Sequence, residues 1–356
     1  MKPRTLDVLV FAAAAALAAH ALLEGGAPAE AALLAPPLPE LLSATGLHEP
    51  GTTRPRPDHL AFAPQYPLWS DGAAKRRWIH LPPGTSIDAS DPDAWSFPPG
   101  TRLWKEFAHG RAVETRYIER LADGTWRFAT YVWDEDGREA RLAPEDGAVV
   151  VRADVPGGRY VVPSRQDCLA CHEGPSVPVL GFSALQLSPD RDGLAPHAEA
   201  REDAHVGLAE MAARGLVRGL PAALLDVPPR VAGRTPVERA ALGYLHANCG
   251  HCHNAGGALD GIDLALAQDA RDPQRSAART LRSLLGHDSR FRPHGAAATQ
   301  RIASDGGPSV LALRMRTDNP LARMPPLGVA IADDEGIALV ERWIHHDLQR
   351  PSETQR

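Results

Sequence analysis

The four cysteines of this chain are all used in two copies of one short pattern, in which two cysteines stand three positions apart and a histidine follows the second. The first copy lies in the stretch QDCLACHEG and the second in LHANCGHCHN. The pattern residues are Cys168, Cys171 and His172 in the first copy, and Cys249, Cys252 and His253 in the second. Three kinds of chemistry use such cysteines: disulfide bonds, a zinc site built from two CxxC pairs, and covalent attachment of haem.

The histidines distinguish between these three kinds of chemistry. Histidine is 15 of 356 residues, so a histidine would follow both cysteine pairs by chance with odds of roughly 0.2%. Neither disulfide bonds nor a zinc site requires a histidine at that position. Haem attachment does, because two thiols at this spacing reach both vinyl groups along one haem edge, and the next residue then offers its imidazole to the iron. The sequence therefore predicts two covalently bound haem c groups, with His172 and His253 as proximal iron ligands.

The N-terminus predicts export, which agrees with haem attachment because that reaction takes place outside the cytoplasm. Residues 1–31 combine a short basic start, an alanine-rich apolar stretch and small residues, the layout of a signal peptide cleaved near Ala29 or Ala31. The apolar run 8–23 is shorter than the roughly 20 residues that span a bilayer, although an uncleaved anchor stays open as an alternative. We expect a periplasmic protein that meets a membrane only through this segment, if the segment stays uncleaved.

Composition and charge indicate a globular protein. Hydrophobic residues make up 44% of the chain and charged residues 23%, and the length predicts about two or three domains. The formal net charge is −6 and there is no basic run, which argues against a nucleic-acid-binding protein. Residues 32–60 are rich in proline without hydrophobic periodicity and predict a tether, and residues 351–356 form a short tail.

Two helices and a loop are predicted around the second pattern. The stretch TPVERAALGYLHANC predicts a helix in which Thr235 is the N-cap, Pro236 takes the first position and Glu238 completes a capping box. The stretch ARMPPLG places Met324 in a proline-stiffened loop, and a methionine sulfur opposite a histidine is the pairing that raises the reduction potential of haem iron. Met315 is a rival ligand, but its setting in LALRMRTD favours a structural role. The stretch ADDEGIALVERWIHHDL predicts a last helix, whose apolar side comprises Ile337, Val340, Trp343, Ile344 and Leu348.

Helix, CxxCH, methionine loop and final helix, in this order, resemble the class I cytochrome c domain over residues 232–350. The resemblance implies that the first and last helices cross beside the haem. It assigns the haem to Cys249 and Cys252, with His253 as proximal and Met324 as distal iron ligand. The glycine and the aromatic residue that usually form the crossing are replaced here by Ala241 and Leu245, and Tyr244 and Trp343 are the residues that would restore the contact.

The region before Cys168 has a different pattern. Alternating apolar and polar runs separated by Asp-Gly turns predict an antiparallel meander of about five strands over residues 100–163. The first pattern therefore follows a β-rich domain, residues 61–165, and lies in a segment with helices, residues 166–231. No methionine-proline loop follows it. The distal side of this iron stays open between Met211, His205, His197 and no ligand at all.

Two stretches further upstream are dense in aromatic and basic residues, YPLWSDGAAKRRWIHLPPG (66–84) and FPPGTRLWKEF (97–107). One interpretation is a solvated loop above buried tryptophans. The other is a set of cations that pair with haem propionates or with an acidic partner. The cations in question are Lys75, Arg76, Arg77, Arg102 and Lys105.

These stretches, followed by CLACHEG, LGFSALQLS, LHANCGHCHNAGG and RMPPLG in that order, resemble an uncharacterised family of bacterial diheme c-type cytochromes. The resemblance covers nearly the whole mature chain, and YPLWSDGAAKRRWI is its more specific part. The family implies two haems and brings no established substrate.

The sequence as a whole predicts an α+β protein, with a β-rich N-terminal region that contains the antiparallel meander, followed by a mostly α-helical class I cytochrome c domain. The predicted function is one-electron transfer between periplasmic donor and acceptor proteins. The alternative is a diheme enzyme of peroxidase or oxidase type, in which the first iron is open and His205, His197 or Arg201 polarises a bound peroxide. A third possibility is a structural or sensory module that uses haem to hold the fold together.

Overall fold

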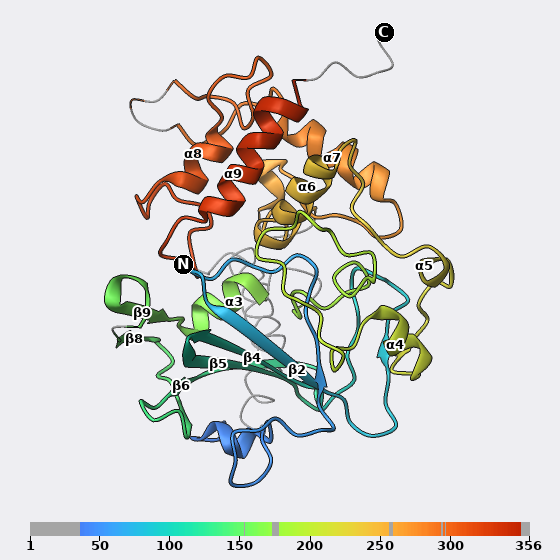
Figure 1. Cartoon of the computed structure of the whole chain (residues 1–356), viewed down its shortest axis with the longest axis vertical. Coiled ribbons are helices and arrows are strands. Elements are labelled where there is room, and N and C mark those ends of the chain that lie inside the picture. Colours follow the sequence, from blue (N-terminus) through green and yellow to red (C-terminus); the bar gives the residue numbers. More distant parts are fainter. Residues whose placement is uncertain are drawn as a thin grey trace, which may run out of the picture.

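The protein has an α+β fold, with an antiparallel sheet at one end and a group of helices at the other (Figure 1). The computed structural model describes residues 36–152, 154–172, 178–255, 259–292, 295 and 297–349. The predicted signal peptide, residues 1–31, and the predicted tail, residues 351–356, lie outside the described residues.

The main sheet has six strands in the order β1-β2-β4-β5-β6-β7, and every neighbouring pair is antiparallel. The strands are β1 (Leu60–Ala61), β2 (Ala74–His80), β4 (Arg102–His109), β5 (Arg111–Arg120), β6 (Trp126–Trp133) and β7 (Ala140–Leu142). Gly124 and Gly137, in two of the Asp-Gly turns, have positive φ angles of 85° and 66°, which glycine adopts without strain. The antiparallel meander is thereby confirmed from β5 to β7, and β4 adds a strand that the alternating pattern does not mark.

The remaining strands form two small sheets. β8 (Ala148–Val151) pairs with β9 (Arg159–Val162) as a separate antiparallel hairpin, so these two strands do not extend the meander as predicted. β3 (Ile87–Asp88) pairs in parallel with β10 (Val217–Arg218), which ties the segment after the first pattern to the β-rich region.

The two aromatic and basic stretches supply strands β2 and β4, so a solvated loop is wrong for these residues, whereas the expected burial of tryptophans is confirmed for Trp78 and Trp104. In β4 both Leu103 and Trp104, whose side chains point to opposite faces, are buried. In β2 the neighbours Trp78 and Ile79 are likewise both buried. A strand covered on both faces lacks the alternation of apolar and polar residues that a half-buried strand shows.

The described part of the predicted tether, residues 36–60, is packed on the sheet, so that prediction is also wrong. Leu42 and Leu47 have no exposed surface and lie in one apolar cluster with Trp78 and Trp104. A short 3-10 turn, η1 (Leu42–Thr45), presents a hydroxyl that accepts a hydrogen bond from Trp104 Nε1 at 2.9 Å. The prolines shape an irregular cover for the sheet here.

The helices occupy the segment after the meander and the C-terminal end (Figure 1). They are α3 (Arg165–His172), α4 (Leu208–Ala213), α5 (Ala223–Asp226), α6 (Pro236–Asn248), α7 (Pro273–Leu284), α8 (Val310–Arg316) and α9 (Asp334–Arg342), which continues into the π-helical turn η4 (Trp343–Asp347). In the part of the chain that the structure describes, none of these helices combines the length and the apolar character needed to cross a membrane.

The start of α6 is confirmed in its main feature. The Thr235 hydroxyl oxygen accepts a hydrogen bond from Glu238 N at 3.0 Å, as expected of an N-cap, and Pro236 is the first helical residue. The Glu238 carboxylate differs from the predicted capping box, because it accepts hydrogen bonds from Arg234 and, at 3.1 Å, from Trp343 Nε1. Glu238 therefore links the start of α6 to the turn that follows α9.

Helices α6 and α9 pack against each other through a large residue on one and a small residue on the other. A Cβ atom added to Gly336 of α9 would lie 2.4 Å from the Tyr244 ring of α6, so only glycine leaves room for the ring. The Tyr244 hydroxyl donates a hydrogen bond to Asp333 Oδ2, the N-cap of α9, at 2.9 Å. Tyr244 and Trp343 thus both contribute to the contact, Tyr244 against Gly336 and Trp343 through its hydrogen bond to Glu238.

Replacing Gly336 with Ala should destabilise the protein. Alanine favours a helix over glycine by about 1 kcal/mol, but overpacking a filled interface costs roughly 1–3 kcal/mol, so the net effect should be a lower midpoint of thermal unfolding. Circular dichroism during heating measures it.

The matched control is Gly261→Ala, because a Cβ atom at Gly261 meets nothing within 4 Å. The control should unfold at the wild-type temperature. A Gly336→Ala protein as stable as the wild type would contradict this account of the helix contact.

Candidate functional site

The first pattern lies on α3, which packs over the main sheet (Figure 1). The helix begins where it does because Ser164 and Asp167 cap it reciprocally. Asp167 Oδ2 accepts a hydrogen bond from Ser164 N at 2.9 Å, and Ser164 Oγ accepts one from Asp167 N at 3.1 Å. At the other end of α3 the ring of His172 lies against Phe128 of β6, with 5.2 Å between the ring centroids. The sheet therefore fixes the orientation of this imidazole.

The hydrogen bonding of His172 leaves one ring nitrogen available as a ligand. Burial lowers the pKa of His172 to about 4, so the ring is neutral at pH 7. Its Nδ1 lies 2.5 Å from the carbonyl oxygen of Pro178, an acceptor, so Nδ1 carries the hydrogen. The lone pair is then on Nε2. A carbonyl that holds the far nitrogen of a histidine is the usual support of a metal-bound imidazole.

The second pattern follows α6 directly. Cys252 and His253 turn back on the helix end, and their backbone N–H groups donate to Cys249 O at 3.2 and 2.9 Å. Burial raises the pKa of the Cys249 thiol to about 12 and lowers the pKa of His253. His253 Nδ1 is buried, and no hydrogen-bond partner for it occurs among residues 36–349 as far as they are described. A buried polar atom without a partner calls for a group that the protein itself does not supply.

The two patterns meet in space although 80 residues separate them in the chain. The side chains of Cys171 and Cys252 lie close to each other, and their interaction raises the pKa of the Cys171 thiol and lowers the pKa of the Cys252 thiol. His251 also lies near Cys171 and opposes the rise in the pKa of that thiol. All four cysteines are free thiols. The helix on the sheet and the helix of the C-terminal region thus present their cysteines to each other.

The pattern residues do not gather as a closed metal site. Within the described ranges, the single group of three or more ligand side chains close enough to hold an ion contains no cysteine.

Met324 lies beside the end of α6. Its backbone N–H donates to Arg314 O at 2.9 Å, which ties the loop to α8. Its side chain lines a small cavity together with Tyr244 and Asn248, and Asn248 immediately precedes Cys249. The rival Met315 lines the same cavity, is 7% exposed and belongs to the apolar core of the helical end.

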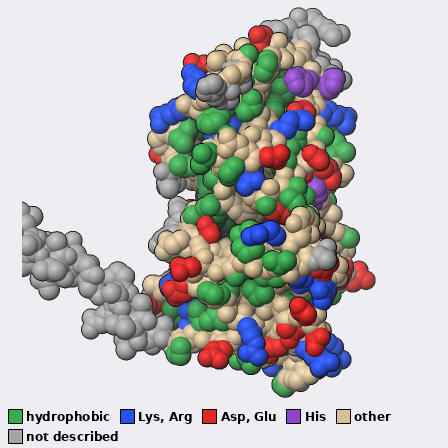
Figure 2. Space-filling view, turned by 90° about the vertical axis from the view of Figure 1, so that its left-hand side faces the viewer, with side chains coloured by type: hydrophobic (Ala, Val, Ile, Leu, Met, Phe, Trp, Pro, Cys, Tyr) green, Lys and Arg blue, Asp and Glu red, His purple; other side chains and the backbone are tan. Residues whose placement is uncertain are grey.

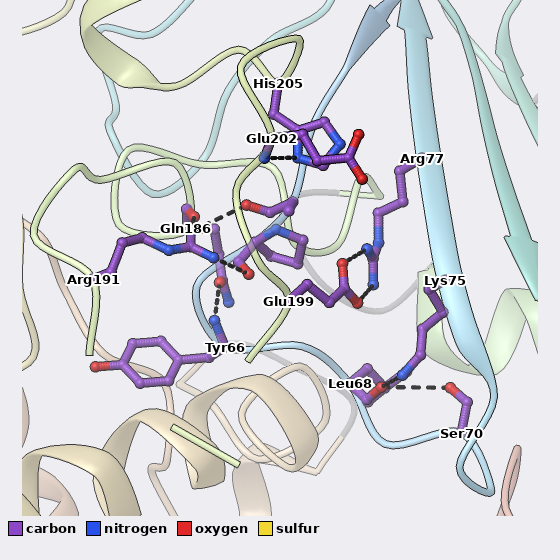
Figure 3. Close-up of polar contacts among 12 residues, drawn as sticks. Tyr66, Leu68, Ser70, Lys75, Arg77, Gln186, Arg191, Glu199, Glu202 and His205 are labelled. Carbon is purple, nitrogen blue, oxygen red and sulfur yellow. Dashed lines mark hydrogen bonds and ion pairs between the residues drawn. The ribbon is translucent and has the colours of Figure 1, made fainter. Parts of the chain in front are cut away.

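The three residues considered for the distal side of the first iron differ in their surroundings. Met211 has no exposed surface and is part of the core beside the sheet. His197 Nε2 lies 2.7 Å from Asp333 Oδ1, and its Nδ1 lies 3.3 Å from Glu335 Oε2, so carboxylates engage both nitrogens. His205 Nδ1 accepts a hydrogen bond from Glu202 N at 3.3 Å (Figure 3).

His205 also lines a cavity of about 600 Å³ that runs along β2. Arg77 crosses it and donates hydrogen bonds of 2.5 and 2.9 Å to the Glu199 carboxylate (Figure 3). Lys75 Nζ donates to Leu68 O at 2.8 Å on the same side. Arg77 and Lys75, which line the cavity, therefore already form some of their possible hydrogen bonds within the protein.

Three cations form a row across the sheet on the side of α3. Arg77, Lys105 and Arg116 lie directly opposite one another on β2, β4 and β5. Lys105 Nζ and the Arg116 guanidinium both stand over the Phe107 ring, at 4.8 and 4.3 Å from its centroid. Arg77 pairs with Glu199 and Arg116 with Glu114, at 2.5 and 2.7 Å. Lys105 has no acidic partner in the described part of the chain, and burial lowers its pKa well below the usual value.

The charges of Lys105 and Arg116 add to burial in lowering the pKa of His172, so the row lies near the first pattern. Sequence reasoning named Arg77 and Lys105 and missed Arg116. Arg116 could be found only from the register of the strands, which aligns its side chain with those of the other two cations. Arg76 and Arg102 point to the opposite face, where Arg76 pairs with Glu106 at 2.6 Å.

The arrangement can do three things: hold two groups through facing cysteines, offer them neutral imidazoles, and place buried positive charge beside one of them. No family model, no curated protein and no solved structure matches this chain.

Proposed function

We propose that this chain is an exported diheme cytochrome c that transfers single electrons between periplasmic donor and acceptor proteins. The observation that carries the proposal is the contact between the side chains of Cys171 and Cys252. Cofactors attached through these two cysteines would approach each other closely, which suits a relay. Each haem, when bound, supplies an iron that changes between the ferric and ferrous states.

The two pattern histidines fit the role of iron ligands. The Pro178 carbonyl holds His172 Nδ1 and leaves Nε2 as the ligand nitrogen, so the ring is oriented before a metal binds. Burial keeps both rings neutral at pH 7, and only a neutral imidazole has a lone pair to give.

The cation row fits the acidic substituents of a haem. A half-buried ammonium group without an anion is costly, and Lys105 is in that position. The two carboxylates of a haem bound at the first pattern would supply the missing charge and form charge-assisted hydrogen bonds. The proposed propionate partners are therefore Arg77, Lys105 and Arg116.

The C-terminal region supports a carrier role for the second site. The α6–α9 contact and the position of the Met324 loop beside Asn248 agree with a class I cytochrome c organisation. With His253 and Met324 as its two axial ligands, the second iron would have no vacant position for a substrate. The export signal proposed for residues 1–31 places this chemistry in the periplasm.

On one side of the molecule, positive and negative side chains are mixed, so the surface charge does little to steer a partner protein. Figure 2 shows Lys and Arg interspersed with Asp and Glu on that face. We therefore propose that partners dock there through short-range contacts, with modest dependence on salt.

A second function, peroxidase-like chemistry at the first site, is favoured by one observation. His205 lines the cavity of about 600 Å³, and its Nδ1 accepts a hydrogen bond, so its other nitrogen carries the hydrogen when the ring is neutral. Such a donor could polarise a bound peroxide, provided that the first iron has an open position.

The ferric absorption and electron paramagnetic resonance spectra distinguish the two functions. For a carrier we expect two low-spin signals, broadened by mutual spin coupling because the irons are close, and no change on addition of cyanide or peroxide. A high-spin iron that binds either reagent would contradict the carrier proposal and support the enzyme.

The variant Met324→Ala extends the same measurement. It should convert one iron to a cyanide-binding form and lower its reduction potential, because the thioether that favours the ferrous state is lost. The control Met315→Leu replaces the neighbouring buried methionine with a residue of similar volume, and its spectrum should be unchanged. An unaltered spectrum and potential in Met324→Ala would remove Met324 from the iron.

A further inference from the structure

Two histidines face each other on the side of the sheet away from α3. Leu60 of β1 lies opposite Ile79 of β2, so the next position along the pair places His59 opposite His80. The two rings have centroids 5.3 Å apart and meet edge to face. Asp58 precedes His59, and the nearest ligand atoms of the three side chains all lie within 4.8 Å of one another.

His59 is buried and its ring lacks the hydrogen bonds that burial demands. The residue is 7% exposed, and its ring lies over Trp104 with 4.8 Å between centroids. Neither Nδ1 nor Nε2 has a hydrogen-bond partner within the described ranges. Buried polar atoms in native proteins are almost always paired, so an orphaned imidazole that faces a second imidazole indicates a missing ligand.

We propose that Asp58, His59 and His80 form a binding site for a divalent metal ion, and that Zn²⁺ is the ion that fits it best. Two imidazole nitrogens and one carboxylate oxygen are a common zinc ligand set, and three protein ligands leave a fourth position for water. Imidazole selects zinc and its neighbours over magnesium or calcium, which prefer oxygen ligands alone. The site is independent of the haems and goes beyond the proposed electron transfer.

The geometry needs a small closure to hold the ion. Ligand atoms bound to one Zn²⁺ at about 2.0–2.2 Å stand about 3.3 Å apart, which is less than the 4.8 Å limit seen here. Asp58 is exposed and His80 half-buried, so both side chains can turn toward the fixed ring of His59. Their exposure also gives the ion a path from solvent.

Two neighbouring cations weaken the site. Arg56 pairs with Asp58 at 3.0 Å, and Arg102 lies opposite His80 in the sheet. The Arg102 guanidinium is held by the Thr45 carbonyl oxygen at 2.9 Å, and it therefore stays near the site. We expect micromolar affinity, weaker than that of a structural zinc site.

Isothermal titration of Zn²⁺ into the full, haem-loaded protein, freed of loose metal by a chelator, tests the proposal. The wild type should bind one ion per chain. Asp58→Asn and His80→Gln should each weaken binding by about tenfold or more, and Arg56→Gln should strengthen it severalfold because a competing cation is gone. His346→Ala removes an exposed histidine elsewhere and should bind like the wild type.

A second readout separates binding from folding. Zn²⁺ should raise the midpoint of thermal unfolding of the wild type, because it binds the folded state, and this rise should be lost in Asp58→Asn, whose exposed side chain is not part of the core. The proposal is overturned if the wild type shows no saturable binding, or if Asp58→Asn and His80→Gln bind Zn²⁺ as tightly as the wild type.

Discussion

The close approach of the side chains of Cys171 and Cys252 is the contact on which the functional account depends, because it joins two parts of the chain that are positioned separately. α3 is held by its cap at Ser164 and by the contact of His172 with the sheet. The second pattern is held by α6, whose place is fixed by the fit of Tyr244 against Gly336. The two patterns are thus positioned by separate contacts, and their cysteines approach each other.

Among the residues that the structure describes, the site contains buried or half-buried polar groups that lack a hydrogen-bond or ion-pair partner. Burial keeps His172 neutral, and the Pro178 carbonyl satisfies one of its nitrogens and leaves the other as a ligand. His253 Nδ1 is buried and Lys105 is half-buried, and neither has the partner that such a group requires in the described part of the chain. A flat cofactor with a metal at its centre and two carboxylates at its edge would take one nitrogen of each imidazole as a ligand and supply the anion that Lys105 lacks. The same reasoning, applied to His59 on the opposite face, leads to a different ion because a carboxylate and a second imidazole surround it.

The sequence predicts the features of the fold and the site that are set by residues close together in the chain, and it does not predict those set by distant residues. The two cysteine patterns, the Thr235 cap and the turns at Gly124 and Gly137 are set by neighbours in the chain, and they were predicted. Strands β2 and β4 were missed because burial on both faces removes the alternation that marks a strand. The packing role of Gly336 and the alignment of Arg116 with Lys105 depend on residues that are distant in the chain. No local sequence pattern therefore predicts them. Residues 36–60 resembled a tether because their order comes from the sheet beneath them.

The central claim is that each pair of thiols is bonded to a haem. The most direct measurement is the intact mass of the mature protein under denaturing conditions, together with alkylation of free thiols. The account predicts a red protein whose mass exceeds that of the processed chain by two haems and in which none of the four cysteines is alkylated. A colourless protein with free thiols, with cysteines paired in disulfides, or with cysteines that hold zinc would contradict it.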